Sequence, residues 1–412
     1  MAKPRLLNLD AFAKTVEDAK VRTASGGLIT VGCILVVLML IMNEWIDYRT
    51  IAIRPELVVD RDRSKKLDIN IDVSFPNMPC DLLTLDIMDV SGDLQADLLK
   101  SGFQKYRLNP DGEQLDGGEF IINQDIKDLI TTNDPNYCGS CYGAISQEGN
   151  DQKKLEDKVC CNTCESVKAA YAQVAWAFYD GKDIEQCEKS GYVEQINQRL
   201  DEGCRIKGTV EINRLAGNLH FAPGSSLTIP GKHVHDMSLY YKHENRFNFD
   251  HEINHFSFGP DPHEGREIEM VKNTKNDVVT STHPLDGHKV IKNEKNHLFS
   301  YYLKVVATRY EFLNGNTLET NQFSSTYHDR PLQGGKDEDH PHTLHARGGI
   351  PSLFFYFDIS PLKVINREQY LKSLSSFLLG ACSAVGGVLT MGYALDRTVW
   401  TANKMLKQKK DT

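Results

Sequence analysis

Two long uncharged stretches constrain this sequence more than any other feature. They cover residues 23–43 and 373–395, so they are 21 and 23 residues long in a chain of 412 residues. A helix needs about 20 apolar residues to cross the hydrocarbon layer of a bilayer. A helix buried in a soluble core is the alternative, and it fits the second stretch better because that stretch is richer in Gly and Ser. We predict two membrane-spanning helices, over residues 24–46 and 373–395.

Basic residues beside these stretches predict how the chain is oriented. Five Lys or Arg residues precede the first stretch and five follow the second. Because short basic flanks stay in the cytosol, we expect cytosolic tails over residues 1–23 and 396–412. Residues 47–372 would then lie on the opposite side of the membrane. The formal net charge of −9 argues against nucleic acid as a partner, since such proteins present a Lys- and Arg-rich face.

Alternating apolar and polar residues predict strands in the region between the two spans. Residues 67–75 and 83–87 have a period of two, and similar patterns recur near 210, over 302–312 and over 353–359. Asn314-Gly315 follows one such run and indicates a hairpin turn. The runs are short and separated by turn residues, so we expect a mainly-β domain resembling a β-sandwich.

Helical periodicity predicts an insert in this domain and a short helix in the N-terminal tail. Residues 165–178 and 183–202 have apolar positions at helical spacing. We therefore expect a cysteine-rich helical insert over residues 130–205. Residues 6–22 have the pattern of an amphipathic helix, which would lie on the membrane or lead into the first span.

The cysteines form a distinctive cluster in the insert. Cys138 and Cys141 are flanked by Tyr137 and Tyr142, and an even number of cysteines lies between the two spans. We favour structural disulfides, because this side of the membrane is oxidising. A zinc site built from two CxxC pairs and a redox-active CxxC pair are the alternatives. The eight cysteines are Cys80, Cys138, Cys141, Cys160, Cys161, Cys164, Cys187 and Cys204.

All fourteen histidines lie between residues 220 and 345. An unperturbed imidazole goes from about one-quarter to about three-quarters charged between pH 7 and pH 6, so several together can sense pH. His220, His233 and His235 are the candidates, and the His233-x-His235 spacing puts both rings on one face of a strand. Solvated histidines without a role are the plain alternative, and metal binding is a weaker one. We predict no metal site and no cofactor.

The C-terminus ends in Lys409-Lys410-Asp411-Thr412. Two lysines at the fourth and third positions from the end match the dilysine signal by which the COPI coat returns membrane proteins. The sequence has no Ser-His-Asp ordering, no phosphate-binding Gly loop and no HExxH motif. We therefore expect a protein that is not an enzyme, and a membrane-bound thiol oxidoreductase or redox chaperone is the second interpretation.

Several long motifs together resemble the ERGIC/ER-vesicle-protein family, and the cysteine motifs resemble its larger, cysteine-rich subunit. The resemblance covers nearly the whole chain. The motifs are Leu9-Asp-Ala-Phe-Ala-Lys-Thr-Val-Glu-Asp18, Ile69-Asn-Ile-Asp-Val-Ser-Phe-Pro-Asn-Met-Pro-Cys80, Leu85-Asp-Ile-Met-Asp-Val-Ser-Gly92, Asn136-Tyr-Cys-Gly-Ser-Cys-Tyr-Gly143, Cys160-Cys-Asn-Thr-Cys-Glu165, Gly217-Asn-Leu-His-Phe-Ala-Pro-Gly224 and His233-Val-His-Asp236.

The resemblance implies a function in transport between the endoplasmic reticulum and the Golgi. Such proteins pair with a smaller homologous subunit, leave in COPII vesicles and return in COPI vesicles. The complex retrieves escaped resident proteins, with binding favoured at the lower Golgi pH. By this resemblance the protein resides in the membranes of the endoplasmic reticulum, the intermediate compartment and the cis-Golgi. Lys409 and Lys410 would form the return signal. The cargo site would be built by Cys138, Cys141, Cys160, Cys161 and Cys164, together with Tyr137 and Tyr142.

Overall fold

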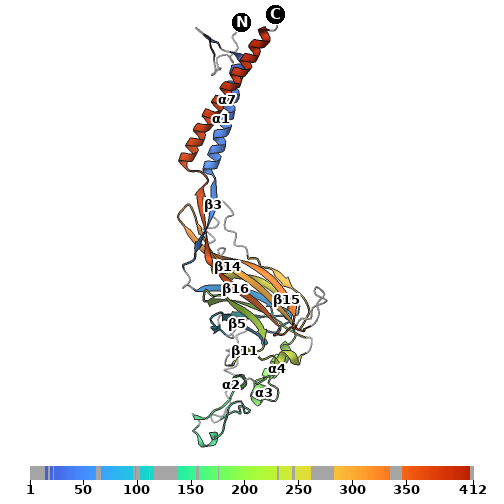
Figure 1. The fold of residues 1–412 in the computed structure, drawn as a ribbon. Helices are drawn as coiled ribbons and strands as arrows, with labels where there is room; N and C mark the ends of the chain where they lie inside the picture. The colour runs from blue at the N-terminus through green and yellow to red at the C-terminus, as the bar shows by residue number, and fades with distance from the viewer. Residues whose placement is uncertain are drawn as a thin grey trace. The chain divides into compact units, whose positions relative to one another are not determined.

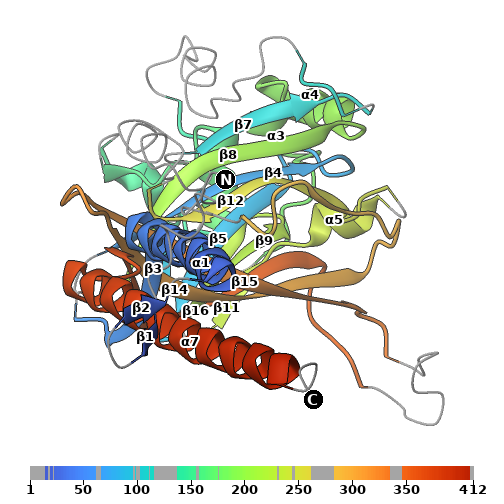
Figure 2. The ribbon, with the colours of Figure 1, turned by 90° about the horizontal axis from the view of Figure 1, so that it is seen from above.

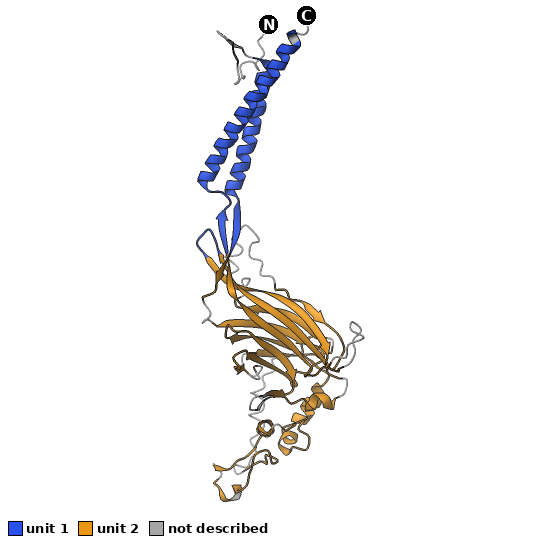
Figure 3. Cartoon of the chain, viewed as in Figure 1, with its two compact units in different colours: residues 1–56, 311–316, 366–412 blue, residues 57–310, 317–365 orange. Residues whose placement is uncertain are grey.

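In the computed structural model the chain forms two compact units (Figure 3). The first comprises Met1–Glu56, Glu311–Asn316 and Asn366–Thr412, and the second comprises Leu57–Tyr310 and Thr317–Ile365. The structure describes residues 14–16, 19–21, 23–61, 66–95, 98, 103–110, 112–115, 137–154, 157–174, 176–229, 232–243, 246–260, 283–334 and 346–408.

Two long helices dominate the first unit. They are α1 (Ala24–Arg49) and α7 (Leu374–Gln408), and both are long and apolar enough to cross a membrane. Most of their large apolar side chains are exposed. Water would not favour such a surface, whereas the hydrocarbon of a bilayer does. The Thr23 side chain caps α1 by accepting a hydrogen bond from the Gly26 amide.

The two helices lie side by side and run antiparallel (Figure 1). Near one end the Lys372 ammonium is 2.7 Å from the Glu44 carboxylate, and further along the Cys33 Sγ is 4.0 Å from the Val388 carbonyl oxygen. Gly380 lies at the contact, where a Cβ would come 2.7 Å from Glu44 Oε2 and displace the end of that side chain. At Gly380 the second span therefore packs closely against the first span of the same chain.

Two short strands stand where the tail helix was predicted. They are β1 (Lys14–Val16) and β2 (Ala19–Val21), which pair antiparallel. The helix prediction is thus wrong for these residues, and the rest of its range lies largely outside the described residues. The β-branched residues Thr15, Val16 and Val21 favour the extended conformation here.

The second unit is built mainly from two antiparallel sheets. Figure 2 shows β7, β8, β4 and β12 side by side, and the full order of that sheet is β13-β12-β4-β8-β7. Its strands are β4 (Leu67–Phe75), β7 (Phe103–Leu108), β8 (Gly203–Ile212), β12 (His251–Phe258) and β13 (His288–Val290).

The other sheet has the order β15-β14-β16-β9-β5-β6, with β3 paired to β16. Its hairpin between β14 and β15 turns at Gly315, whose φ of 83° is the left-handed value expected for Asn-Gly. The strands are β3 (Ile51–Val59), β5 (Leu83–Asp89), β6 (Leu94–Gln95), β9 (Gly217–Pro223), β14 (His297–Glu311), β15 (Thr317–Pro331) and β16 (Ser352–Tyr370).

The two sheets pack face to face around one apolar core. The Phe256 ring on β12 stacks on Phe355 of β16 with ring centroids 4.7 Å apart, and Phe75 of β4 lies 5.1 Å from Phe221 of β9. All four rings are fully buried. This arrangement confirms the expected sandwich-like, mainly-β domain between two apolar helices.

A small cysteine-rich insert interrupts the strands before β8. Gly191, with φ of 69°, separates the two helices in a segment predicted as one. The first insert helix ends five residues earlier than predicted, because the chain then extends and the Phe178 amide donates to the Asp236 carboxylate instead. The insert contains η3 (Asn150–Gln152), α2 (Cys164–Gln173), α3 (Glu185–Lys189) and α4 (Tyr192–Arg199).

After β9 the chain forms a separate hairpin and a short helix. The hairpin is β10 (Ser226–Ile229) paired with β11 (Lys232–His235), and the helix is α5 (Ser238–Lys242). Gly224 is required before the hairpin, since its φ is 81° and a Cβ would lie 1.7 Å from the Asp236 carbonyl oxygen.

Candidate functional site

Disulfide bonds pair all eight cysteines between the two spans, which confirms the disulfide interpretation. Three of the bonds cross-link the insert, and the fourth joins the segment before β5 to β8. The two remaining cysteines, Cys33 and Cys382, lie in the membrane-spanning helices as free thiols. The pairs are Cys80–Cys204, Cys138–Cys160, Cys141–Cys161 and Cys164–Cys187.

This pairing bears on the zinc and redox alternatives. Cys138 and Cys141 form one CxxC pair, yet each bonds to a different partner outside that pair. A thioredoxin-like enzyme closes its CxxC on itself during turnover, and a zinc site needs thiolates. Neither chemistry is available to the insert cysteines in this oxidised state.

Side-chain amides complete the packing of the insert loops. The Gln186 amide donates to the carbonyl oxygens of Cys161, at 2.7 Å, and Ser140, at 2.9 Å. A Cβ at Gly139 would lie 2.2 Å from the Cys161 carbonyl oxygen, so only glycine fits there. The disulfides and these hydrogen bonds together hold the loops in one conformation.

The tyrosines that flank the first CxxC differ from the aromatic residues further along the insert. Tyr142 is half-buried, and its hydroxyl accepts a 2.9 Å hydrogen bond from the Glu185 amide. Tyr137 is also half-buried, below the Lys189 ammonium. Trp176 and Tyr179, in contrast, are 46% and 54% exposed. Trp176 and Tyr179 are the exposed aromatic rings among the described residues of the insert.

The insert is attached beside β11 and α5. The Phe178 amide donates to Asp236 Oδ2 at 2.9 Å, and the Tyr179 amide donates to Ser238 Oγ at 2.9 Å. Asp180 forms an ion pair with Lys242. The residue that follows His235 in the chain is therefore also an anchor of the insert.

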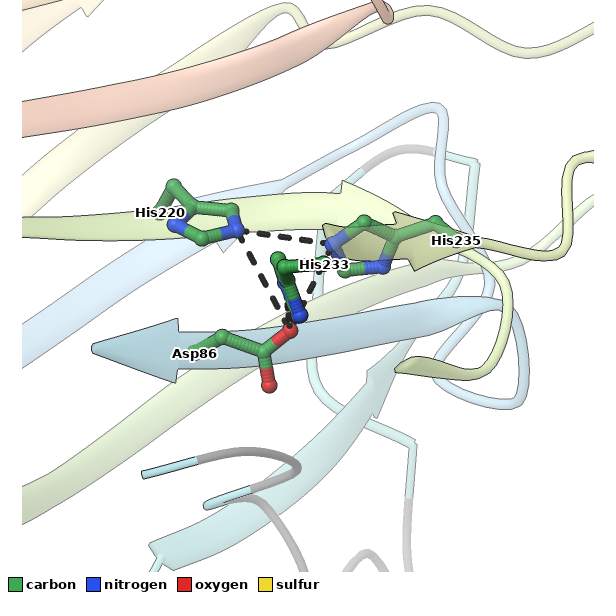
Figure 4. A group of neighbouring side chains, drawn as sticks. All are labelled: Asp86, His220, His233 and His235. Atoms are coloured by element: carbon green, nitrogen blue, oxygen red, sulfur yellow. Dashed lines mark hydrogen bonds and ion pairs between the residues drawn. The ribbon is translucent and has the colours of Figure 1, made fainter. Parts of the chain in front are cut away.

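The three candidate histidines come together around Asp86 (Figure 4). Asp86 on β5 and His220 on β9 are direct cross-strand partners. His233 and His235 point to the same carboxylate from β11, as their spacing predicted. We call these four residues the His–Asp cluster.

The cluster is tightly packed and almost without solvent. Asp86 Oδ2 lies 3.0 Å from the Nε2 of His233, 3.4 Å from that of His235 and 4.0 Å from that of His220. The Nε2 atoms of His220 and His235 are 3.4 Å apart. The exposed side-chain fractions are 0% for Asp86, 1% for His235, 4% for His220 and 15% for His233.

Burial makes His220 unsuited to sensing mild acid. Burial first, and then the neighbouring His235, lower the pKa of His220 to about 3, although Asp86 opposes the shift. His220 is therefore neutral at both pH 7 and pH 6, and its charge does not change between these values.

Asp86 is the member of the cluster that sequence reasoning missed. It lies between the core residues Leu85 and Ile87, so strand alternation places it on the face away from the core. A carboxylate there is ordinarily solvated. Its cross-strand partner His220 and the β10–β11 hairpin bury it. Neither neighbour can be recognised from the residues on either side of Asp86 in the sequence. The predicted retrieval lysines, Lys409 and Lys410, lie outside the described residues.

Comparisons with known proteins agree over the whole chain. A family model described as "Endoplasmic reticulum vesicle transporter" matches residues 141–396. A second, described as "Endoplasmic Reticulum-Golgi Intermediate Compartment (ERGIC)", matches residues 6–96.

Similar proteins span the same length. "ER-derived vesicles protein ERV46" of Saccharomyces cerevisiae is 50% identical over 100% of both chains. "Probable endoplasmic reticulum-Golgi intermediate compartment protein 3" of Dictyostelium discoideum is 36% identical over 99% of this chain and 98% of its own. The solved structure "Crystal Structure of Erv41p" aligns with 76% of this chain and 99% of its own at 17% identity, with a TM-score of 0.37.

Proposed function

This chain belongs to the family of endoplasmic reticulum vesicle transporters, and we propose that it is a cargo receptor returning escaped resident proteins from the Golgi. Its relatives make it a membrane protein of vesicle transport between the endoplasmic reticulum and the Golgi. The proposal adds the direction of transport and the capture of soluble proteins on the side of the membrane opposite the tails.

The single observation that carries the proposal is the construction of the insert. Its loops are cross-linked by three disulfides and present Trp176 and Tyr179 to solvent. Rigid loops with exposed aromatic rings lose little conformational entropy on binding and supply large contact areas. The insert cysteines shape this surface, and the aromatic side chains contact cargo. Their disulfide pairing offers no reactive thiol, which weighs against the oxidoreductase interpretation.

A capture experiment with the full-length protein in detergent tests the proposal. The immobilised receptor would be incubated with soluble resident proteins of the endoplasmic reticulum at pH 7.2 and pH 6.2. We expect bound cargo from the intact protein and at least a tenfold loss in Trp176→Ala. The matched control is Tyr302→Ala, which removes an exposed ring from β14. Equal capture by both variants would move the cargo site away from the insert, and no capture by the folded intact protein would overturn the receptor assignment.

We also propose that cargo binds more tightly at the lower pH. His220 is neutral throughout this range and does not contribute. His233 and His235, which contact the same buried Asp86 carboxylate, are not assigned this role either. Several further histidines lie on the β-domain, among them His255, His288 and His328. Capture that is unchanged between the two pH values would contradict pH-dependent release.

Recycling requires signals outside the described residues. We propose that Lys409 and Lys410 recruit the COPI coat, that COPII vesicles carry the protein forward, and that a smaller homologous subunit accompanies it. Replacing both lysines with serine is expected to move the steady-state location toward the Golgi, measured by microscopy of the tagged full-length chain. An unchanged location would exclude this tail as the return signal.

A further inference from the structure

We propose that Asp86, His220, His233 and His235 form a closed binding site for one Zn²⁺ ion. The proposal does not depend on the receptor function, and it replaces the prediction of no metal site. Its starting point is the convergence of four ligand atoms, all within 4.8 Å of one another, from three different strands.

Three of the six distances between these atoms are close to those of tetrahedral zinc coordination. With Zn–N and Zn–O bonds of about 2.0–2.1 Å, neighbouring ligand atoms lie about 3.3 Å apart. The distances here are 3.0 Å from His233 to Asp86, 3.4 Å from His235 to Asp86 and 3.4 Å from His235 to His220. The distance from His220 to Asp86 is 4.0 Å, and all six pairs lie within 4.8 Å, so side-chain movements of about an ångström would bring the four atoms to tetrahedral spacing.

Hydrogen bonds at their Nδ1 atoms orient two of the imidazoles for ligation. His220 Nδ1 is 3.1 Å from the Asn218 side-chain oxygen, which can only accept, so Nδ1 carries the proton. Thr84 Oγ1 donates to the Ala222 or Gly224 carbonyl oxygen and is thus left to accept from His235 Nδ1, 3.3 Å away. In both rings the Nε2 lone pair then faces the cluster centre, as in metal-bound histidines with an anchored second nitrogen.

His233 also points its Nε2 inward. That atom is 3.0 Å from Asp86 Oδ2, yet neither ring nitrogen of His233 makes a hydrogen bond of acceptable geometry with the described residues. A hydrogen bond would need the donor directed at the acceptor, whereas two metal ligands need only share a centre.

Four protein ligands and deep burial indicate a structural site. Catalytic zinc sites keep a coordination position for water, whereas closed sites with four protein ligands stabilise the fold. Imidazole nitrogens with one carboxylate suit zinc better than calcium or magnesium, which prefer oxygen ligands. The ion would bond β11 to β5 and β9, and so attach the β10–β11 hairpin to the larger sheet. Asp236 follows His235 and accepts a hydrogen bond from the Phe178 amide, so the ion would also stabilise the attachment of the insert.

A plain Asp–His hydrogen-bonded cluster is the alternative, with a proton in place of the metal. A measurement of bound zinc distinguishes the metal site from the hydrogen-bonded cluster. The described cysteines outside the membrane helices are all in disulfides and do not compete for zinc. The full-length protein in detergent would be stripped with a chelator, dialysed and titrated with Zn²⁺, and its metal content measured by elemental analysis. Titration with Co²⁺ would report the geometry through its visible absorption.

We expect one tightly bound Zn²⁺ per chain and a tetrahedral Co²⁺ spectrum without thiolate charge-transfer bands. His233→Gln and Asp86→Asn are each expected to weaken binding at least tenfold. His328→Ala, which removes an exposed imidazole from β15, is the matched control and should bind as the intact protein does. No stoichiometric zinc in the intact protein, or an octahedral Co²⁺ spectrum, would overturn the proposal without any variant having to fold. Metal is measured here without cargo, so this result and the capture experiment can fail independently.

Discussion

The sandwich and its cysteine-rich insert are stabilised by different means, although one compact unit contains both. The two sheets share a continuous apolar core, in which Phe75, Phe256 and Phe355 are completely buried. The insert has its own small cluster of nine buried residues, and four of these are disulfide-bonded cysteines. The sandwich therefore depends mainly on burial, with one disulfide, Cys80–Cys204, across it, whereas the insert depends on three disulfides. Loss of the three insert disulfides would disrupt a receptor surface built there, while the apolar core and the Cys80–Cys204 bond keep the sandwich folded.

The largest expected effect comes from removing a core ring. Phe256→Ala deletes a fully buried ring that stacks on Phe355 at 4.7 Å, and it should lower the free energy of unfolding by about 3–5 kcal/mol. Chemical denaturation followed by far-ultraviolet circular dichroism measures this loss. Val90→Ala, at an exposed position, should change it by less than about 0.5 kcal/mol. A loss of stability confined to the insert would contradict the dependence of the sandwich on its buried core.

Removing an insert disulfide should give the next largest effect. The double variant Cys141→Ser/Cys161→Ser opens a bond with a sequence separation of 20, which is expected to destabilise the insert by about 3 kcal/mol. Limited proteolysis should then cut the insert, while the sandwich retains its unfolding transition. Cys33→Ser/Cys382→Ser, which removes the two free thiols, is the matched control.

The disulfide pairs determine which two cysteines must be replaced together. Cys161→Ser/Cys164→Ser would break two different disulfides and leave Cys141 and Cys187 as free thiols. If Cys141→Ser/Cys161→Ser, which removes one complete disulfide, also abolished the unfolding transition of the sandwich, the two regions would unfold as one.

Zinc removal is expected to have a smaller, local effect. At a free zinc concentration ten times the Kd, binding stabilises the native state by about 1.4 kcal/mol. Hydrogen exchange should accelerate in β10 and β11 and at the Phe178 amide, whose acceptor Asp236 adjoins the cluster. Uniform acceleration across both sheets would instead indicate that the ion stabilises the whole sandwich.

The smallest expected effect is the change in the free energy of unfolding with pH that a histidine in the sandwich core causes. Burial lowers the pKa of His251 to about 4, and the neutral ring has both nitrogens bonded, at 2.9 Å to the Phe249 carbonyl oxygen and at 2.8 Å to the Tyr301 hydroxyl. The nearby His288 lowers this pKa further. Since the unfolded histidine binds a proton below about pH 6.5 and the native one does not, stability falls as the pH falls between 6.5 and 4.

The expected loss from His251 between pH 7.2 and 6.2 is only about 0.5 kcal/mol, so the domain stays folded across the compartments. Denaturant titrations at pH 7.2, 6.2 and 5 measure the slope. His251→Gln, which can keep a hydrogen bond to Tyr301, should reduce it. An unchanged slope in that variant would assign the pH dependence to other groups.

Local patterns predicted most of the strands and both spans. Residues 67–75 alternate strictly, and β4 occupies that range. Short-range errors occurred where tertiary contacts overrode periodicity, as at Phe178, whose amide is held by Asp236 rather than by a continuing helix. The histidine pair on β11 was predicted to share a face, and it does, but its carboxylate partner was not foreseen.

The sequence by itself determined the two membrane helices, the alternation of the strands and the presence of disulfides, because each depends on neighbours in the chain or on composition. Only the tertiary structure decided which cysteines pair and which side chains meet Asp86. Cys80 and Cys204 are 124 residues apart, and Asp86 and His220 come from strands that are still further apart along the chain. Contacts at such separations depend on how the sheets assemble, because the hydrophobic core selects one strand order and register from many that satisfy the same local pattern.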